Sequence, residues 1–266
     1  MDIKQQKSDN RQGRHGIFMH QLGSLGLLLI VLGEALSLVH ILPWSQYVFP
    51  LFWYGYILVL DSLNHRLHAH SLASSRRGEF LLMLPISVCY WQIFEWYNVA
   101  IQNWLYINTP PEKWLELTMK IASFATVIPA VYETTDILGA MPWTKRAFGI
   151  SCRLPANCPK GALALGLILS LLPLLLPDLF FWSIWVGPFL LLDAINHLRD
   201  RPSLLHDWQA GDIGRTLVLL MSGYVCGFFW EFWNYWAYTK WIYAVPIPDM
   251  PHIFERFYKT DKTGAG

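Results

Sequence analysis

Charged residues are scarce in this chain of 266 residues, where Asp, Glu, Lys and Arg together make up 15% of the sequence. Ordinary soluble domains carry roughly 25%. Apolar residues reach 54% and the net charge is only +1, so the composition excludes an electrostatic nucleic-acid binder. Several apolar runs approach the roughly 20 residues that a helix needs to cross a bilayer. The composition therefore predicts an all-α, polytopic transmembrane helical bundle rather than a soluble helical core.

Cysteine pairs and the common catalytic motifs are also missing. The four cysteines form no CxxC pair, and no GxSxG, HExxH or phosphate-binding glycine loop stands in a suitable context. The polar start of the chain leads into an apolar run that continues to Glu34 without a small-residue cleavage site. We therefore expect the first apolar segment to remain as a membrane anchor, and the sequence identifies no cofactor.

Apolar runs predict seven spanning helices, and the positive charges between them predict their orientation. The helices are expected over 17–41, 46–64, 79–105, 114–139, 161–176, 178–197 and 214–240. Fourteen lysines and arginines before Lys240 fall on one side of this arrangement, which predicts that this side and the N-terminus are cytoplasmic. The expected organisation is a cytoplasmic arm (1–16), a first membrane repeat (17–140), a cytoplasmic linker (141–160), a second membrane repeat (161–245) and a periplasmic tail (246–266).

The chain resembles itself at two places. "WYGYILVLDSLNH" (Trp53 to His65) aligns without a gap to "WVGPFLLLDAINH" (Trp185 to His197), and "FEWYN" (Phe94 to Asn98) matches "WEFWN" (Trp230 to Asn234). The matched helices are the second and sixth and the third and seventh, so the period is four helices. An even period predicts two parallel internal repeats, helices 1–4 and 5–7, without an eighth span to complete the second copy.

Polar residues recur inside these repeats at helical spacing. In each "DxxNH" motif the three side chains share one helix face near the cytoplasmic end, and in each "ExxN" motif the glutamate and asparagine share a face in the outer half of the membrane. A carboxylate at that depth is costly against lipid, so we expect the acids to line an internal cavity and to share a proton or hold a cation. The alternative is that the pairs only join helices through hydrogen bonds. The cavity candidates are Glu95, Asn98, Glu231, Asn234, Asp61, Asn64, His65, Asp193, Asn196 and His197.

Histidines offer a competing interpretation, because "HRLHAH" has a spacing that can ligate a metal. The weak metal candidates are His65, His68, His70 and His197. The HxxxH and HxxHH boxes of membrane di-iron hydroxylases are missing, which favours solvated loop histidines.

Three segments carry a resemblance to a known family. "FWEFWNYWAYTKWIYAVP", "FATVIPAVYETTDIL" and "EFLLMLPISVCYWQIFEWYN" are similar to a family of bacterial multi-pass membrane proteins that has no assigned activity. The resemblance covers the chain from about residue 50 to 255. It implies a further apolar segment after Ile253 to Glu255, where this chain instead reads "RFYKTDKTGAG".

These observations leave three hypotheses about function. The first is an integral inner-membrane protein whose carboxylate and amide cavity binds or transports a small cation, a proton or a lipid headgroup. The second is a membrane-embedded enzyme that acts on a lipid or isoprenoid, with or without a metal. The third is a structural membrane scaffold. The expected partners are the lipid bilayer and a lipid or small-ion ligand, with no nucleic acid.

Overall fold

The computed structural model describes residues 3–68, 70–141, 154–155 and 157–244, which are mostly helical. The helices are α1 (Ile3–Val39), α2 (Val48–His68), α3 (Leu72–Ser75), α4 (Arg77–Ile101), α5 (Lys113–Phe124), α6 (Val127–Gly139), α7 (Cys158–Leu175), α8 (Pro177–Phe180), α9 (Ser183–Leu198), α10 (Leu204–Ala210) and α11 (Gly214–Trp236). A 3-10 helix, η1 (Trp44–Gln46), and two strands, β1 (Trp104–Ile107) and β2 (Lys240–Tyr243), complete the described elements.

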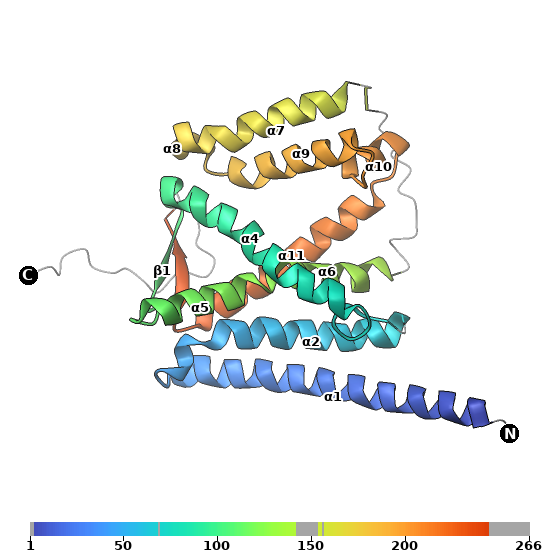
Figure 1. The fold of residues 1–266 in the computed structure, drawn as a ribbon. Helices are drawn as coiled ribbons and strands as arrows, with labels where there is room; N and C mark the ends of the chain where they lie inside the picture. The colour runs from blue at the N-terminus through green and yellow to red at the C-terminus, as the bar shows by residue number, and fades with distance from the viewer. Residues whose placement is uncertain (1–2, 69, 142–153, 156, 245–266) are drawn as a thin grey trace, which may run out of the picture.

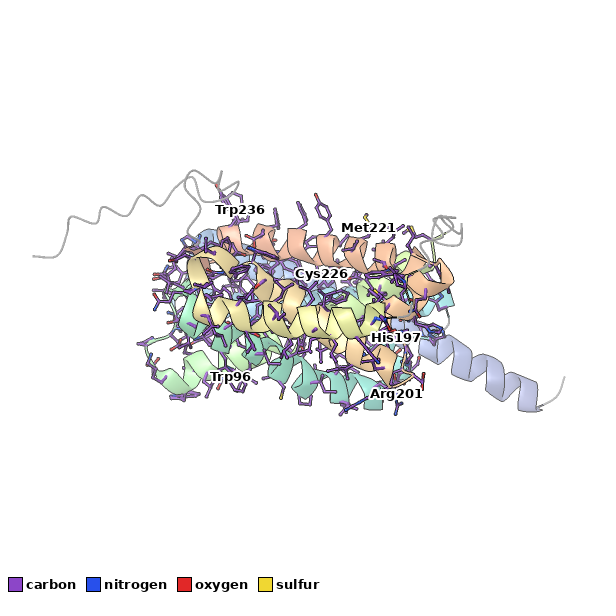
Figure 2. The ribbon with its side chains drawn as sticks, turned by 90° about the horizontal axis from the view of Figure 1, so that it is seen from above. Trp96, His197, Arg201, Met221, Cys226 and Trp236 are labelled. Carbon is purple, nitrogen blue, oxygen red and sulfur yellow. The ribbon has the colours of Figure 1, made fainter. Side chains whose placement is uncertain are left out.

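Two helical hairpins flank a crossing pair of long helices. Figure 1 shows α1 and α2 side by side below, α7 and α9 side by side above, and α4 and α11 crossing between them. Helix α6 packs against α2, α4 and α11. In the second view, the N-terminal part of α1 extends beyond the rest of the bundle (Figure 2).

Close helix contacts in both hairpins depend on glycine. A Cβ atom added at Gly26 of α1 would lie 2.6 Å from the backbone oxygen of Gly55 in α2. In the second hairpin, a Cβ at Gly187 of α9 would lie 2.5 Å from the backbone nitrogen of Ser170 in α7. Gly55 and Gly187 occupy matched positions of the two sequence motifs. Small residues let helix backbones approach closely where no water drives association, which is typical of membrane bundles.

Aromatic side chains form the centre of the bundle. The rings of Phe52 and Trp233 stack with centroids 4.8 Å apart, and Trp53 contacts the Trp233 ring edge to face at 5.1 Å. All three side chains are buried. This cluster joins α2 to α11, which are far apart in the sequence.

The structure confirms a helical bundle and is compatible with a membrane protein by the length and composition of its helices. Four described segments are long and apolar enough to cross a membrane: His20–Val39, Lys113–Gly139, Cys158–Leu175 and Gly214–Trp236. The other three expected spans correspond to α2, α4 and α9, and the count of seven stays a prediction.

Several predicted boundaries were wrong. The helix expected over 114–139 is interrupted between α5 and α6, because Pro129 cannot donate a backbone hydrogen bond and its ring clashes with the preceding turn. The buried Ser87 hydroxyl of α4 compensates: it donates to the Phe124 carbonyl at 2.5 Å and accepts from the Ile128 N–H at 3.0 Å. The helices expected to continue to 105 and 240 instead end at Ile101 and Trp236, before short strands.

The arm predicted over 1–16 belongs to α1 from Ile3 onward. Most of the predicted linker (141–160) and the whole predicted tail (246–266) lie outside the described residues.

Candidate functional site

The aspartates of the two "DxxNH" motifs bind backbone N–H groups at the start of a short helix. The Asp61 carboxylate accepts from the Ala73 N–H at 2.6 Å in α3. In the second copy, the Asp193 carboxylate accepts from the Leu204 and Leu205 N–H groups at 2.8 and 2.9 Å in α10. The first N–H groups of a helix lack partners within the helix, and a carboxylate there satisfies them. Both aspartates therefore hold a short helix against the end of α2 or α9.

The asparagines of these motifs have different surroundings in the two halves. Asn64 is buried and donates to the backbone oxygen of Glu133 at 3.0 Å and to its carboxylate. Glu133, on α6, is fully buried and also accepts from the Leu72 N–H of α3 at 3.3 Å. Asn196, the counterpart of Asn64, is exposed on α9. No helix in the described residues occupies against α9 the position that α6 occupies against α2.

The first "ExxN" motif fastens strand β1 to α4. The Asn98 side chain accepts from the Trp104 N–H at 3.1 Å and donates to the Trp104 carbonyl at 2.8 Å. The Glu95 carboxylate accepts from the Tyr106 hydroxyl at 2.7 Å and from the Trp104 indole at 3.2 Å. The carboxylate and amide are thus both engaged by the strand that follows their own helix.

The second "ExxN" motif makes matching asparagine and tyrosine contacts with β2. Asn234 accepts from the Trp241 N–H at 3.0 Å and donates to the Trp241 carbonyl at 2.9 Å, while the Tyr243 hydroxyl donates to Glu231 at 2.5 Å. Both glutamates are half-buried. Each is bonded to a tyrosine of its own half, so the expected cavity of shared carboxylates finds no direct support in these contacts.

Strands β1 and β2 form a two-stranded ribbon, and its geometry explains why each "ExxN" motif contains an asparagine. Strands β1 and β2 pair antiparallel, with Leu105 opposite Ile242 and Trp104 opposite Tyr243. In an antiparallel pair, the N–H and C=O of one residue point to the same side of its strand. The groups of Trp104 and Trp241 that the asparagines bind therefore lie on the outer edges of the ribbon. An asparagine carries one donor and one acceptor group and satisfies both without water.

The histidines do not gather into a metal centre in the described part of the chain. His68 and His70 stack with ring centroids 5.7 Å apart, and His197 lies 6.1 Å from His206 and 3.3 Å from the Ser203 hydroxyl. His65 is half-buried at the end of α2. Among the described residues, no three His, Cys, Asp or Glu side chains are placed to share an ion.

A large polar cavity opens at the end of the bundle where α2 finishes and α11 begins, the end predicted to be cytoplasmic. We call it the polar-end cavity. It has a volume of about 830 Å³ and is lined by Leu67, His68, His70, Arg76, Thr135, Asp136, Gly139, Ala140, Asp212, Gly214, Arg215 and Val218.

Both arginines of the polar-end cavity are held in place by other side chains. Arg76 donates to the Glu79 carboxylate at 2.9 Å and to the Tyr132 hydroxyl at 2.5 Å, and the hydrogen bonds with Glu79 raise the pKa of the guanidinium above its usual value. The Nε atom of Arg215 lies 2.9 Å from the Asp207 carboxylate, which is part of α10. The aspartate-capped short helices therefore position charged groups at this end of the bundle.

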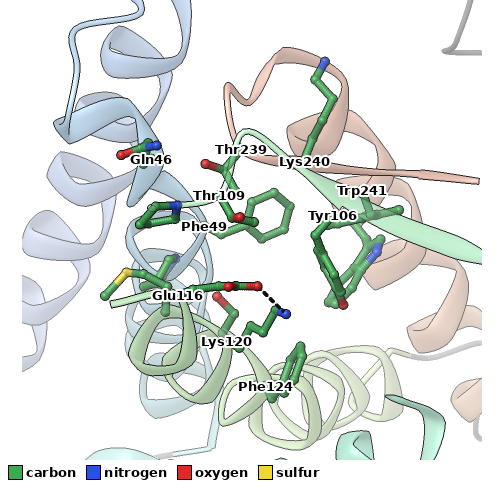
Figure 3. Close-up of a pocket in the computed structure, with 15 residues that line it drawn as sticks. Gln46, Phe49, Tyr106, Thr109, Glu116, Lys120, Phe124, Thr239, Lys240 and Trp241 are labelled. Carbon is green, nitrogen blue, oxygen red and sulfur yellow. Dashed lines mark hydrogen bonds and ion pairs between the residues drawn. The ribbon is translucent and has the colours of Figure 1, made fainter. Parts of the chain in front are cut away.

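A smaller cavity of about 70 Å³ lies at the opposite end, between α2, α5 and the ribbon. Figure 3 shows Glu116 and Lys120 facing each other in it and the Lys240 side chain directed away from it. The Lys120 ammonium lies 2.7 Å from Glu116 and 4.8 Å from the centre of the Tyr106 ring. Burial lowers the pKa of Lys240, whose ammonium donates to the Tyr235 carbonyl at 2.8 Å. The charges here are largely paired, and the volume suits water more than an organic ligand.

Sequence reasoning missed the short helices and the ribbon. Continuing the alignment of the two "DxxNH" motifs without a gap matches Ser71-Leu72 with Ser203-Leu204. Extending the alignment in this way would have pointed to α3 and α10. The matched "NWLYI" and "KWIYA" segments are rich in aromatic and β-branched residues, which favour strands. From the sequence, Arg76 and Arg215 open the third and seventh expected helices, where they orient the chain or meet lipid phosphate. That they line one cavity was not predicted.

Comparison with known proteins adds no relative to this description. No family model matches the chain, and no curated protein or solved structure is significantly similar to it.

Proposed function

We propose that this protein is a multi-pass membrane protein that binds the headgroup of a zwitterionic phospholipid in the polar-end cavity. The proposal includes the seven predicted spans, with α2, α4 and α9 crossing beside the four apolar segments. At 1.5 Å per residue, the 25 residues of α4 extend about 37 Å, enough to cross the hydrocarbon region at a tilt. The proposal also includes the predicted cytoplasmic location of the N-terminus.

The observation that supports the ligand is the mixture of charges in one open cavity. Arg76 and Arg215 supply guanidinium groups, while Asp136 and Asp212 supply carboxylates. Arginine has five N–H donors arranged to bind phosphate oxygens. The ion pair of Arg215 with Asp207 is made through Nε, so its terminal N–H groups can bind a phosphate. A phosphate suits the arginines and a primary ammonium suits the aspartates, so a headgroup with both charges fits better than a purely anionic one.

The place of the cavity in the membrane supports the same ligand. Helices α2 and α9 end there and α4 and α11 begin there, so the cavity lies at the depth of lipid headgroups in the proposed arrangement. Its volume of about 830 Å³ is within the range of sites for small organic molecules. The hypotheses of ion transport and of catalysis at the "ExxN" acids have weaker support, because those acids bind tyrosines of the ribbon.

Native mass spectrometry of the detergent-purified protein tests this proposal. With phosphatidylethanolamine, phosphatidylglycerol and diacylglycerol of identical acyl chains in competition, we expect phosphatidylethanolamine to be retained preferentially. Arg215→Gln should lower its retention at least tenfold, whereas Arg199→Gln should not change it, since Arg199 is exposed at the same end and does not line the cavity.

A second variant examines the ammonium contact. Asp136→Asn should reduce the preference for phosphatidylethanolamine over phosphatidic acid, because phosphatidic acid keeps the phosphate and lacks the amine. Equal retention of diacylglycerol and phosphatidylethanolamine by the unmodified protein would refute the proposal. Wild-type retention in the Arg215 variant would refute it as well.

A further inference from the structure

A second large cavity lies between helices, away from the polar end. It has a volume of about 390 Å³ between α1, α2, α6 and α11, and we call it the Glu34 cavity. Its lining is almost entirely apolar and includes the aromatic side chains of Tyr56, Phe229, Phe232 and Trp233. Glu34 is the only charged residue among the described residues that line it.

Glu34 has few partners for an acid at its position. It belongs to the candidate span His20–Val39, between one and two turns before Val39. The Trp233 indole donates to its carboxylate at 3.1 Å. None of the four ion pairs among the described residues includes Glu34. A charged group in this environment is costly unless something of opposite charge accompanies it.

The other polar groups of the cavity are already engaged with one another. The Tyr56 and Thr134 hydroxyls lie 2.8 Å apart, and Thr134 donates to the Ala130 carbonyl at 2.7 Å. A metal ion such as Na⁺ or Ca²⁺ requires several oxygen ligands, and a single carboxylate beside two engaged hydroxyls does not supply them. Among the described residues, no arginine, lysine or histidine lines the cavity to bind a phosphate, so its chemistry differs from that of the lipid site proposed above.

Aromatic rings surround the open volume near the acid. The rings of Tyr56 and Phe229 lie 5.4 Å apart and those of Phe229 and Trp233 5.2 Å apart, and Trp233 is the residue that bonds Glu34. Aromatic faces attract organic cations, with a larger effect where water is excluded. A volume of about 390 Å³ is in the range of small-molecule sites.

We propose that the Glu34 cavity binds a lipophilic organic monocation, such as a quaternary ammonium or phosphonium compound with apolar substituents. The cation places its charge beside the Glu34 carboxylate and its apolar groups against Phe229, Phe232 and the aliphatic side chains. Tyr56 and Thr134 stay bonded to each other. This activity is independent of the phospholipid site, because the two cavities share no lining residue.

Equilibrium dialysis of tetraphenylphosphonium against the full-length protein in detergent tests the site. We expect saturable binding of one cation per chain. Glu34→Gln should weaken it about tenfold or more, although glutamine still accepts the Trp233 hydrogen bond and preserves the fold. Glu112→Gln, which removes an exposed acid at the start of α5, should leave the affinity unchanged.

Two further arms distinguish a charge-selective site from partitioning into the micelle. Tetraphenylborate, an anion of the same shape, should show no saturable binding. Ile137→Trp should abolish binding of the cation by filling the cavity while Glu34 remains. Helical content and melting temperature establish that each variant is folded. An unchanged affinity in Glu34→Gln, equal binding of tetraphenylborate, or no saturable binding by the unmodified protein would each overturn the proposal. None of these results affects the phosphatidylethanolamine experiment.

Discussion

Replacing Asn234 by leucine should destabilise the protein substantially, because this one side chain satisfies two backbone groups of β2. Asn234 is only 8% exposed, and its two hydrogen bonds to Trp241 measure 2.9 and 3.0 Å. Each lost bond is worth about 0.5–1.5 kcal/mol, and each backbone group left buried without a partner costs about 1–3 kcal/mol. Partial access of water to the ribbon edge reduces the sum, so we expect a loss of about 2–5 kcal/mol in the free energy of unfolding.

The matched residues of the chain provide the controls. Asn98 makes the equivalent bonds to Trp104 and is half-buried, so Asn98→Leu should cost about 1–3 kcal/mol. Asn196 is exposed on α9, and Asn196→Leu should change stability by less than about 0.5 kcal/mol. Reversible unfolding by sodium dodecyl sulfate in mixed micelles, followed by tryptophan fluorescence, measures all three. A cost below about 0.5 kcal/mol for Asn234→Leu, or an equal cost for Asn196→Leu, would refute this account of the ribbon.

Two further predictions concern the hairpins and the short helices. Gly26→Ala should cost about 1–3 kcal/mol in the same assay, because its Cβ would lie 2.6 Å from the rigid Gly55 carbonyl. Gly223→Ala is the matched control, since nothing lies within 4 Å of its Cβ, and equal effects of the two changes would contradict tight packing of α1 on α2. Asp193→Ala should raise the rate of amide hydrogen exchange across α10 (Leu204–Ala210), consistent with a loss of about 0.5–2 kcal/mol for a missing cap. Unchanged exchange at Leu204 and Leu205 would show that this carboxylate does not hold the helix.

The helices could be predicted from the sequence because their cause is local. Long apolar runs between polar loops identify α1, α2, α7 and α11, although α1 begins earlier than predicted and α11 ends at Trp236 rather than at 240. The break between α5 and α6 was not predicted. Pro129 is a local signal for a break, but the break is accommodated by Ser87, a residue of another helix, which satisfies the backbone groups left open. No pattern within 114–139 encodes that contact.

The polar residues of the motifs could be identified from the sequence, and their role as cavity residues stays a prediction. Self-comparison identified the polar residues that matter to the fold, and the structure brings each of the four acids into matched hydrogen bonds. Their partners could not be read from helical spacing. The asparagines and glutamates bind a ribbon that becomes visible only when β1 and β2, 133 to 139 residues apart along the chain, pair with each other. The polar-end cavity likewise gathers side chains from distant segments.

The number of hydrogen-bond partners, together with the open volume beside the carboxylate, distinguishes Glu34 from Asp193, Glu95 and Glu133 in this bundle. Asp193 accepts two backbone hydrogen bonds, and Glu95 accepts from a tyrosine and a tryptophan, so both carboxylates are engaged within the fold. Glu133 is fully buried and binds Asn64 and the Leu72 N–H. Glu34 differs, because one indole donor approaches it while a cavity of about 390 Å³ stays open beside it. Replacing Asp193, Glu95 or Glu133 should lower the stability of the fold. Replacing Glu34 should instead weaken cation binding, with little effect on the fold.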